Sequence, residues 1–164
     1  MTWFALLKLV HIASAMWLVG GLLCRYVALR AASRSDDLGS TRAIVDVAGR
    51  YENWMVIPGS IAVLLSGLLT AMLGGLPLLG PVQGGASWVP LSLIIFMLAL
   101  GLLPPLVFLP RGRLFGQALD EAVALGRVTG ELRRAFADRA VARAHSVELV
   151  GLAVIVALMV LKPF

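Results

Sequence analysis

Residues 53–110 read NWMVIPGSIAVLLSGLLTAMLGGLPLLGPVQGGASWVPLSLIIFMLALGLLPPLVFLP, a run of 58 residues without one Asp, Glu, Lys or Arg. Two windows inside this run, Trp54 to Leu76 and Trp88 to Pro110, are each as long as the stretch of about 20 apolar residues that a helix needs to cross a bilayer. The segment between them, Pro77 to Ser87, is uncharged and rich in turn-forming residues. The run therefore predicts two membrane-spanning helices joined by a short connection.

Two further apolar windows flank this hairpin, Trp3 to Cys24 and Ser146 to Leu161. The last is short for a span, and we expect it to continue toward the N-terminus as a helix. The chain is 60% hydrophobic, which is far more than a water-soluble domain carries. We predict an all-α polytopic membrane protein, a single domain over residues 1–164 that forms a four-transmembrane-helix bundle.

The basic residues are confined to the segments between the apolar windows. Arg25 to Arg50 and Arg111 to Arg143 together hold 12 of the 14 Lys and Arg residues. Because such residues concentrate on the cytoplasmic side of membrane proteins, residues 25–53 and 111–145 are predicted to be cytoplasmic and both termini periplasmic. The formal net charge of +5 then predicts contact with anionic membrane lipids, and not with nucleic acid. The expected location is a bacterial inner membrane.

Prolines and glycines predict interruptions in these helices. Pro58 in the second span and Pro104 with Pro105 in the third each remove a backbone donor, so kinks are expected there. In the second basic segment, apolar residues recur at helical spacing up to Leu125, Gly126 interrupts the pattern, and Leu132 resumes it. We expect this segment to be helical and to lie along the membrane or to lengthen the third and fourth spans.

Lys8 and His11 are ionisable groups within the first span, three residues apart and therefore on one helix face. Such groups are functional candidates, because placing them in a membrane is unfavourable. His11 lies roughly 12 Å from the boundary at Trp3, where a neutral imidazole suits a haem iron or copper. Lys8 can pair with a haem propionate. A histidine bonded to a neighbouring helix, with Lys8 reaching toward the surface, explains the same pattern.

A second axial ligand must lie at the same depth as His11. His145 does not, because it lies near the opposite boundary, about 18 Å away in depth for a core of about 30 Å. Met97 does, at roughly 13 Å from Trp88, and histidine with methionine is a known haem ligand pair. Methionine is also a common packing residue in helical bundles.

His145 and Glu148 form a second pair three residues apart, at the predicted cytoplasmic rim that also holds Glu52 and Arg25. These four residues predict a secondary polar cluster. It either joins helix ends through ion pairs or, as a histidine with carboxylates, binds a metal ion or relays protons. No phosphate-binding glycine loop, zinc-type cysteine pattern or nucleophile elbow occurs, and the sequence identifies no catalytic residue.

The first span reads Lys8-Leu-Val-His11-Ile-Ala-Ser-Ala-Met-Trp17-Leu-Val-Gly20-Gly21, followed by Arg25. It resembles small bacterial membrane proteins around the CopD copper-resistance domain and the HemJ-type protoporphyrinogen oxidases, and in layout a related family of predicted integral membrane proteins. The resemblance implies that His11 contacts haem and that Lys8 matches the lysine before it. The third span lacks the lysine that those oxidases carry, which argues against oxidase activity.

These observations favour an integral membrane protein that binds haem b, with His11 as the iron ligand and Lys8 and Met97 as its candidate partners. Its expected role is electron transfer, as a redox subunit beside a redox partner or other membrane subunits. Two alternatives stay open. The first is a non-catalytic accessory subunit of a larger membrane complex, and the second is copper handling or transport through His11 and nearby methionines.

Overall fold

The computed structural model describes residues 3–76, 78 and 88–162, and all regular elements in that part of the chain are helical. Four helical segments are long and apolar enough to cross a membrane: Trp3–Ala32, Leu38–Leu73, Trp88–Ala124 and Gly130–Leu161. The prediction of an all-α, four-span bundle is therefore confirmed. Apart from Leu78, the predicted connection from Pro77 to Ser87 lies outside the described residues.

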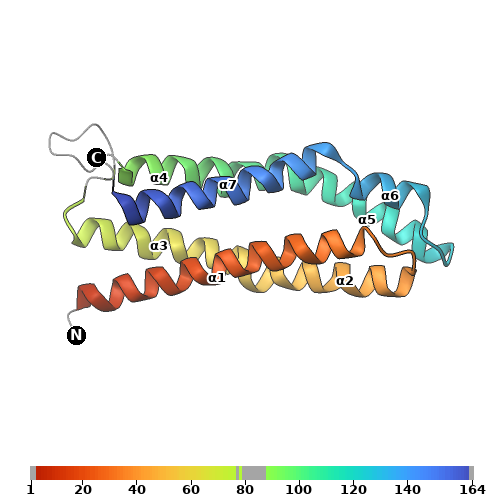
Figure 1. Ribbon diagram of the computed structural model, residues 1–164, viewed down its shortest axis with the longest axis horizontal. Coiled ribbons are helices and arrows are strands. Elements are labelled where there is room, and N and C mark those ends of the chain that lie inside the picture. The colour runs from red at the N-terminus through yellow and green to blue at the C-terminus, as the bar shows by residue number, and fades with distance from the viewer. Residues whose placement is uncertain (1–2, 77, 79–87, 163–164) are drawn as a thin grey trace.

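The first half of the chain is an antiparallel pair of rods (Figure 1). Its elements are α1 (Trp3–Ala32), α2 (Leu38–Tyr51), the π-helical turn η1 (Glu52–Val56) and α3 (Ile57–Leu73). The last three follow one another without a break and pack along α1. Both rods continue past the predicted spans, because their charged ends are helical as well.

The second half repeats this plan. Its elements are α4 (Trp88–Phe96), the π-helical turns η2 (Met97–Leu102) and η3 (Pro104–Phe108), α5 (Leu109–Ala124), α6 (Gly130–Phe136) and α7 (Arg139–Leu161). The run from α4 to α5 forms one long rod, and α6 with α7 returns beside it (Figure 1). Thus α5 lengthens the third span and the start of α7 lengthens the fourth, one of the two arrangements expected from the sequence.

The two pairs of rods are joined mainly in their apolar half. Leu18 and Leu22 of α1 pack there with Val56, Phe96, Leu152 and Ile155 in one buried core. At the other end, α2, α5, α6 and the adjoining ends of α1 and α7 carry most of the basic residues; we call this the basic end. The first residues of α1 and the last residues of α7 lie at the opposite, apolar end of the bundle (Figure 1).

Glycines set the close approach of α1 to η1 and α3. A Cβ added at Gly21 would lie 2.6 Å from Cβ of Met55, and one added at Gly59 would lie 3.2 Å from Cα of Leu18. Real Cβ atoms do not come that close to such neighbours without a shift. Small residues at these positions therefore fix how α1 is seated against the second rod.

Pro58 explains an unusual contact between α1 and η1. Proline has no N–H, so Pro58 cannot donate to the carbonyl of Trp54, its helical partner four residues earlier. The indole Nε1 of Trp17 donates to that carbonyl instead, at 3.2 Å. Unpaired carbonyls are unfavourable in a membrane, and α1 thus supplies a donor in place of the N–H that Pro58 lacks.

The interruptions expected farther along the chain also occur. Pro104 and Pro105 begin η3, so the missing donors coincide with a π-helical turn. Gly126 has φ +65° and separates α5 from α6. Phe115 of α5 then packs edge-on against Phe136 of α6, with ring centroids 4.9 Å apart. The apolar residues before and after Gly126 thus lie on two antiparallel helices and pack against each other.

Candidate functional sites

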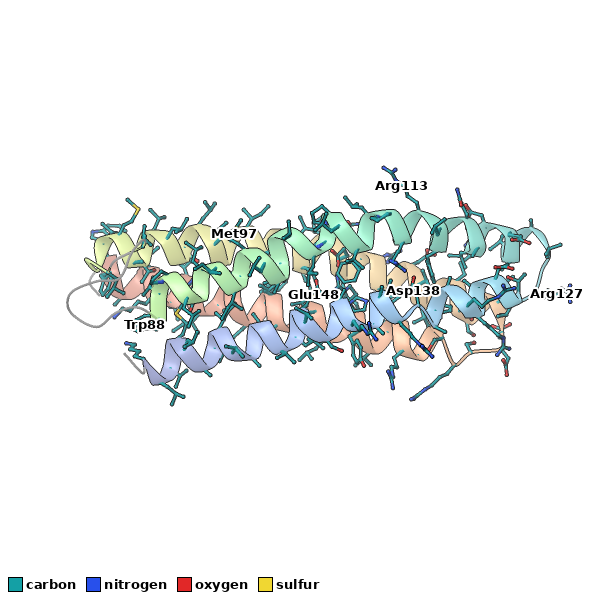
Figure 2. All side chains as sticks on the ribbon, turned by 90° about the horizontal axis from the view of Figure 1, so that it is seen from above. Trp88, Met97, Arg113, Arg127, Asp138 and Glu148 are labelled. Carbon is teal, nitrogen blue, oxygen red and sulfur yellow. The ribbon has the colours of Figure 1, made fainter. Side chains whose placement is uncertain are left out.

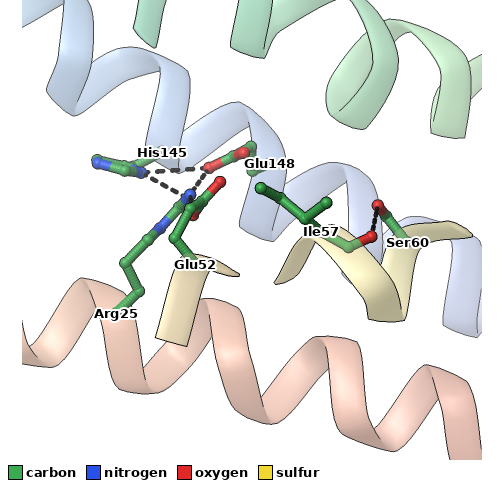
Figure 3. Close-up of polar contacts among 6 residues, drawn as sticks. All are labelled: Arg25, Glu52, Ile57, Ser60, His145 and Glu148. Carbon is green, nitrogen blue, oxygen red and sulfur yellow. Dashed lines mark hydrogen bonds and ion pairs between the residues drawn. The ribbon is translucent and has the colours of Figure 1, made fainter. Parts of the chain in front are cut away.

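A buried charged cluster joins three parts of the bundle where the apolar half meets the basic end (Figure 3). Arg25 of α1 forms ion pairs with Glu52 of η1 and, at 2.5 Å, with Glu148 of α7. His145 Nδ1 lies 3.1 Å from Arg25 Nη2 and 3.2 Å from Glu148 Oε2. We call these four residues the Arg25 cluster; they are the residues that the sequence placed at one rim.

The cluster is enclosed on most sides. Arg25 is 6% exposed, His145 8% and Glu148 1%. Figure 2 shows Glu148 within the bundle, whereas Arg113 points away from it. Two carboxylates face one guanidinium, so the cluster carries a charge of −1 with a neutral imidazole and zero with a protonated one. It joins α1, η1 and α7 electrostatically, and it resembles the ion-pair alternative more than a metal site.

An aromatic ring closes the cluster. Phe108, the last residue of η3, stacks on His145 with ring centroids 4.7 Å apart and planes at 28°. The Arg25 guanidinium lies 5.4 Å from the same ring centroid. Two π-helical turns therefore contribute to the site, η1 with Glu52 and η3 with Phe108. Phe108 could not be singled out from the sequence, because it is one of many apolar residues in its span.

His11 lies in the other half of the bundle, between α1 and α3. Its Nδ1 is 3.1 Å from Ser66 Oγ. Ser66 is buried, and its hydroxyl donates to the Ala62 carbonyl at 2.5 Å. A hydroxyl has one proton, so Ser66 Oγ accepts from His11 and the imidazole proton is on Nδ1. In the neutral ring, Nε2 then carries the free lone pair.

The ring of His11 occupies space that Gly67 leaves open. A Cβ added at Gly67 would lie 2.9 Å from His11 Cε1 and 3.7 Å from Nε2. None of the described side-chain hydrogen bonds of the ring is at Nε2, and the backbone of Val63 is a further hydrogen-bond partner of the ring. Nε2 is therefore the ring nitrogen without a side-chain partner. Ser66 and Gly67 stood out in the sequence only as small residues suited to close helix packing.

The other predicted haem residues have different surroundings. Lys8 is exposed, and its Nζ lies 4.3 Å from the ring centroid of Phe4, toward the N-terminus of α1. Met97 is 48% exposed and begins η2, which packs on α4 and α7. His11 contacts α3 instead, so the structure does not bring Met97 to His11. Among the described residues, no group of three or more His, Cys, Asp or Glu side chains could hold a metal ion.

Comparison with known proteins gives a family and no closer relative. No curated protein and no solved structure matches the chain. One family model, described as "Predicted integral membrane protein (DUF2269)", matches residues 5–163. The match covers all four apolar segments and both basic segments. The chain therefore belongs to the DUF2269 family of predicted integral membrane proteins.

Proposed function

We propose that this protein binds haem b in the apolar half of the bundle, with Nε2 of His11 as an axial ligand of the iron, and that it serves as a redox subunit in the membrane. The observation that carries the proposal is the contact between His11 Nδ1 and Ser66 Oγ at 3.1 Å, from which the proton position is inferred. Ser66 fixes the proton on Nδ1, and the free lone pair on Nε2 is the form that binds iron.

The surroundings of His11 fit this ligand role. A histidine that binds a metal through one ring nitrogen usually donates from the other to a fixed acceptor, which orients the ring. Ser66 is such an acceptor, and Gly67 holds the ring against α3. A hydrogen bond from Nδ1 alone leaves a polar nitrogen unpaired in an apolar region, which is unfavourable. An iron ion would satisfy it.

Lys8 suits the propionate side of a haem. It lies one helical turn from His11 toward the apolar end of the bundle, and its ammonium group is exposed. A charge-assisted hydrogen bond to a propionate is stronger than one between neutral groups. Bound haem supplies reversible one-electron chemistry at its iron. Within one chain, His145 is held in the Arg25 cluster and Met97 is not brought to His11, so a second iron ligand would come from a small molecule or from another subunit.

The test is an absorption spectrum of the protein in mild detergent, before and after dithionite, after expression with added haem. We expect a Soret band that shifts on reduction, retained in His145→Gln and lost in His11→Ala. These two variants remove the two histidines of the chain one at a time. A featureless wild-type spectrum would overturn the proposal and favour the accessory-subunit role, and bound copper without a porphyrin spectrum would favour copper handling.

A second pair of variants tests the positioning of His11 without removing it. Gly67→Ala would place a methyl group 2.9 Å from His11 Cε1, whereas Gly20→Ala would meet Cε of Met55 at an ordinary 3.6 Å. We expect Gly67→Ala to weaken haem binding by roughly 10- to 100-fold, the usual effect of disturbing a ligand's support, and Gly20→Ala to leave it unchanged. Equal haem affinity in both variants would contradict this geometry.

A further inference from the structure

A cavity of about 1330 Å³ lies at the basic end, between the first pair of rods and the second. α1 and α2 line one side of it, and η3, α5, α6 and the start of α7 line the other, which are the segments that stand apart in Figure 1. Its volume exceeds the range of about 300–1,000 Å³ that holds a drug-sized ligand. The cavity therefore has room for a large ligand and is distinct from the His11 site.

Much of the cavity wall is apolar and aromatic. The side chains that give it this character are Tyr26 and Leu29 from α1, Phe108 from η3, Leu109 and Phe115 from α5, and Phe136 from α6. These residues alternate with charged ones along the same helices, so an apolar surface and arginines face the same space. Such a lining matches an amphiphile with a long apolar part and a charged head.

Two arginines of the cavity wall have no carboxylate partner among the described residues, and one of them, Arg30, donates from Nη1 to Tyr26 Oη at 3.3 Å. Five arginines line the cavity, and three of them form ion pairs within the protein: Arg25 with Glu52 and Glu148, Arg111 with Asp138, and Arg134 with Glu131. Arg30 and Arg34 have no carboxylate partner in the described part of the chain. Glu121 is the lining carboxylate without a described ion pair. The unpaired positive charge is local: it lies on Arg30, near the end of α1, and on Arg34, just beyond that end, whereas the Arg25 cluster has two carboxylates for one guanidinium.

A buried donor next to the cavity is also unsatisfied. Arg25 lines the cavity and is 6% exposed, yet its Nε has no hydrogen-bond partner. Among the described residues, no other enclosed side-chain nitrogen or oxygen atom lacks a hydrogen-bond partner. Buried donors are almost always paired, but this atom has almost no accessible surface, so a ligand in the cavity reaches it only if the Arg25 side chain shifts.

The depth of the cavity identifies the kind of amphiphile. Arg25 follows Trp3 by 22 residues, about 33 Å along a helix, which is close to the roughly 30 Å thickness of the bilayer's hydrocarbon core. Arg30 lies five residues farther along α1, and Arg34 lies in the turn that follows Ala32, the last residue of α1. The cavity therefore begins at the edge of the hydrocarbon core, next to the lipid headgroups, and basic pockets between helices in this region bind anionic headgroups.

We propose that this cavity binds one anionic phospholipid, with Arg30 and Arg34 contacting the phosphate and an acyl chain lying against Tyr26, Leu29 and Phe108. Guanidinium groups suit this task because their fork of N–H donors matches phosphate oxygens. The acyl chain lies beside the Arg25 cluster, because Phe108 stacks on His145, so the lipid joins the two pairs of rods where few side chains do. This site is independent of haem binding at His11.

The test is native mass spectrometry of the full chain in mild detergent, titrated with phosphatidylglycerol or with zwitterionic phosphatidylcholine. We expect one phosphatidylglycerol bound at least tenfold more tightly than phosphatidylcholine, and at least a tenfold loss of this affinity in Arg30→Gln/Arg34→Gln. The control Arg42→Gln/Arg127→Gln removes the same charge from exposed arginines outside the cavity, and it should bind as the wild type does. Equal loss in both double variants would overturn the site.

A steric pair of variants tests the same site without changing charge. Gly112 lines the cavity and Gly116 does not, and an added Cβ at either has nothing within 4 Å. Gly112→Trp should block phosphatidylglycerol and Gly116→Trp should not, with equal helicity by circular dichroism. Binding that survives in Gly112→Trp, or that millimolar inorganic phosphate abolishes, would overturn a lipid site, the second result pointing to a soluble phosphate ligand.

Discussion

Nη2 of Arg25 lies 2.5 Å from Oε2 of Glu148, and this ion pair joins the first span to the fourth across 123 residues of sequence. Both side chains are nearly enclosed, at 8% and 2% exposed. Two charges so far from water are favourable only when each is well paired. The pair therefore holds α1 and α7 in one relative position.

Glu148→Ala tests how much this ion pair contributes to the stability of the folded protein. We expect it to lower the free energy of unfolding by about 3 kcal/mol, the lower end of the usual effect of removing one partner of a buried pair, because Glu52 still faces Arg25. Glu131→Ala is the matched control, since Glu131 and Arg134 are exposed and their pair contributes at most about 1 kcal/mol. Both are measured by SDS titration in mixed micelles, followed by circular dichroism. Equal losses would mean that the buried pair acts like a surface pair.

Two adjacent glycines make a second comparison. A Cβ at Gly21 would lie 2.6 Å from Cβ of Met55, but one at Gly20 would meet only Cε of Met55, at 3.6 Å. Gly21→Ala should therefore destabilise the bundle by about 1–3 kcal/mol, as overpacking does. Gly20→Ala should be neutral or slightly stabilising in the same titration. A neutral Gly21→Ala would show that α1 is not seated on η1 as described.

Trp17→Phe removes the donor that satisfies the Trp54 carbonyl freed by Pro58. We expect a loss of about 1 kcal/mol, within the range measured for hydrogen bonds between membrane helices. Trp3→Phe is the control, because Trp3 is 86% exposed and makes no described hydrogen bond. Restoring the missing donor with Pro58→Ala should make the Trp17→Phe change nearly neutral. If the loss persists in the Pro58→Ala background, the indole contributes through packing alone.

Acid should loosen the start of α2. Asp37 caps this helix, and the Ser40 N–H that donates to its carboxylate at 2.7 Å holds the pKa of Asp37 below its ordinary value. A pKa lowered by folding stabilises the folded state above the ordinary value of about 3.9, and this stabilisation is lost as the pH falls through the folded value.

The measurement is hydrogen–deuterium exchange of the first amides of α2, corrected for intrinsic rates, between about pH 5 and about pH 3. In the wild type, the protection of these amides should decrease as the pH is lowered. In Asp37→Asn it should change less over the same range, because a neutral asparagine caps a helix about as well as aspartate. The same pH dependence in both proteins would rule out the carboxylate as its source.

Much of the architecture could be predicted from the sequence. The apolar windows from Trp54 and from Trp88 gave two spans, and Gly126 marked the break between α5 and α6. These are local properties: the length of an apolar run, a missing charge or a positive φ depends on neighbouring residues alone. The helix ends were less predictable, because α1 continues to Ala32 through residues that are charged and still helical.

The two sites were predictable only in part. His145 and Glu148 are three residues apart and therefore share a helix face. Arg25 and Glu52 were expected at the same depth in the membrane. Which of the charged residues at that level would meet was not predictable, and Arg50 and Arg143 remain exposed. Met97 matched His11 in depth but not in position around the bundle, because depth follows from counting residues and position follows from which helices pack together.

The sequence by itself determined that this chain is a four-span helical membrane protein with its charge at one end, since bilayer thickness and the exclusion of charge from hydrocarbon act on each segment separately. Only the tertiary structure decided that Ser66 fixes the proton of His11, that Trp17 satisfies Trp54, and that Arg25 meets Glu148. Those contacts depend on how each helix is rotated about its own axis. Close packing between helices, at residues such as Gly21, sets this rotation, so it cannot be derived from any single segment.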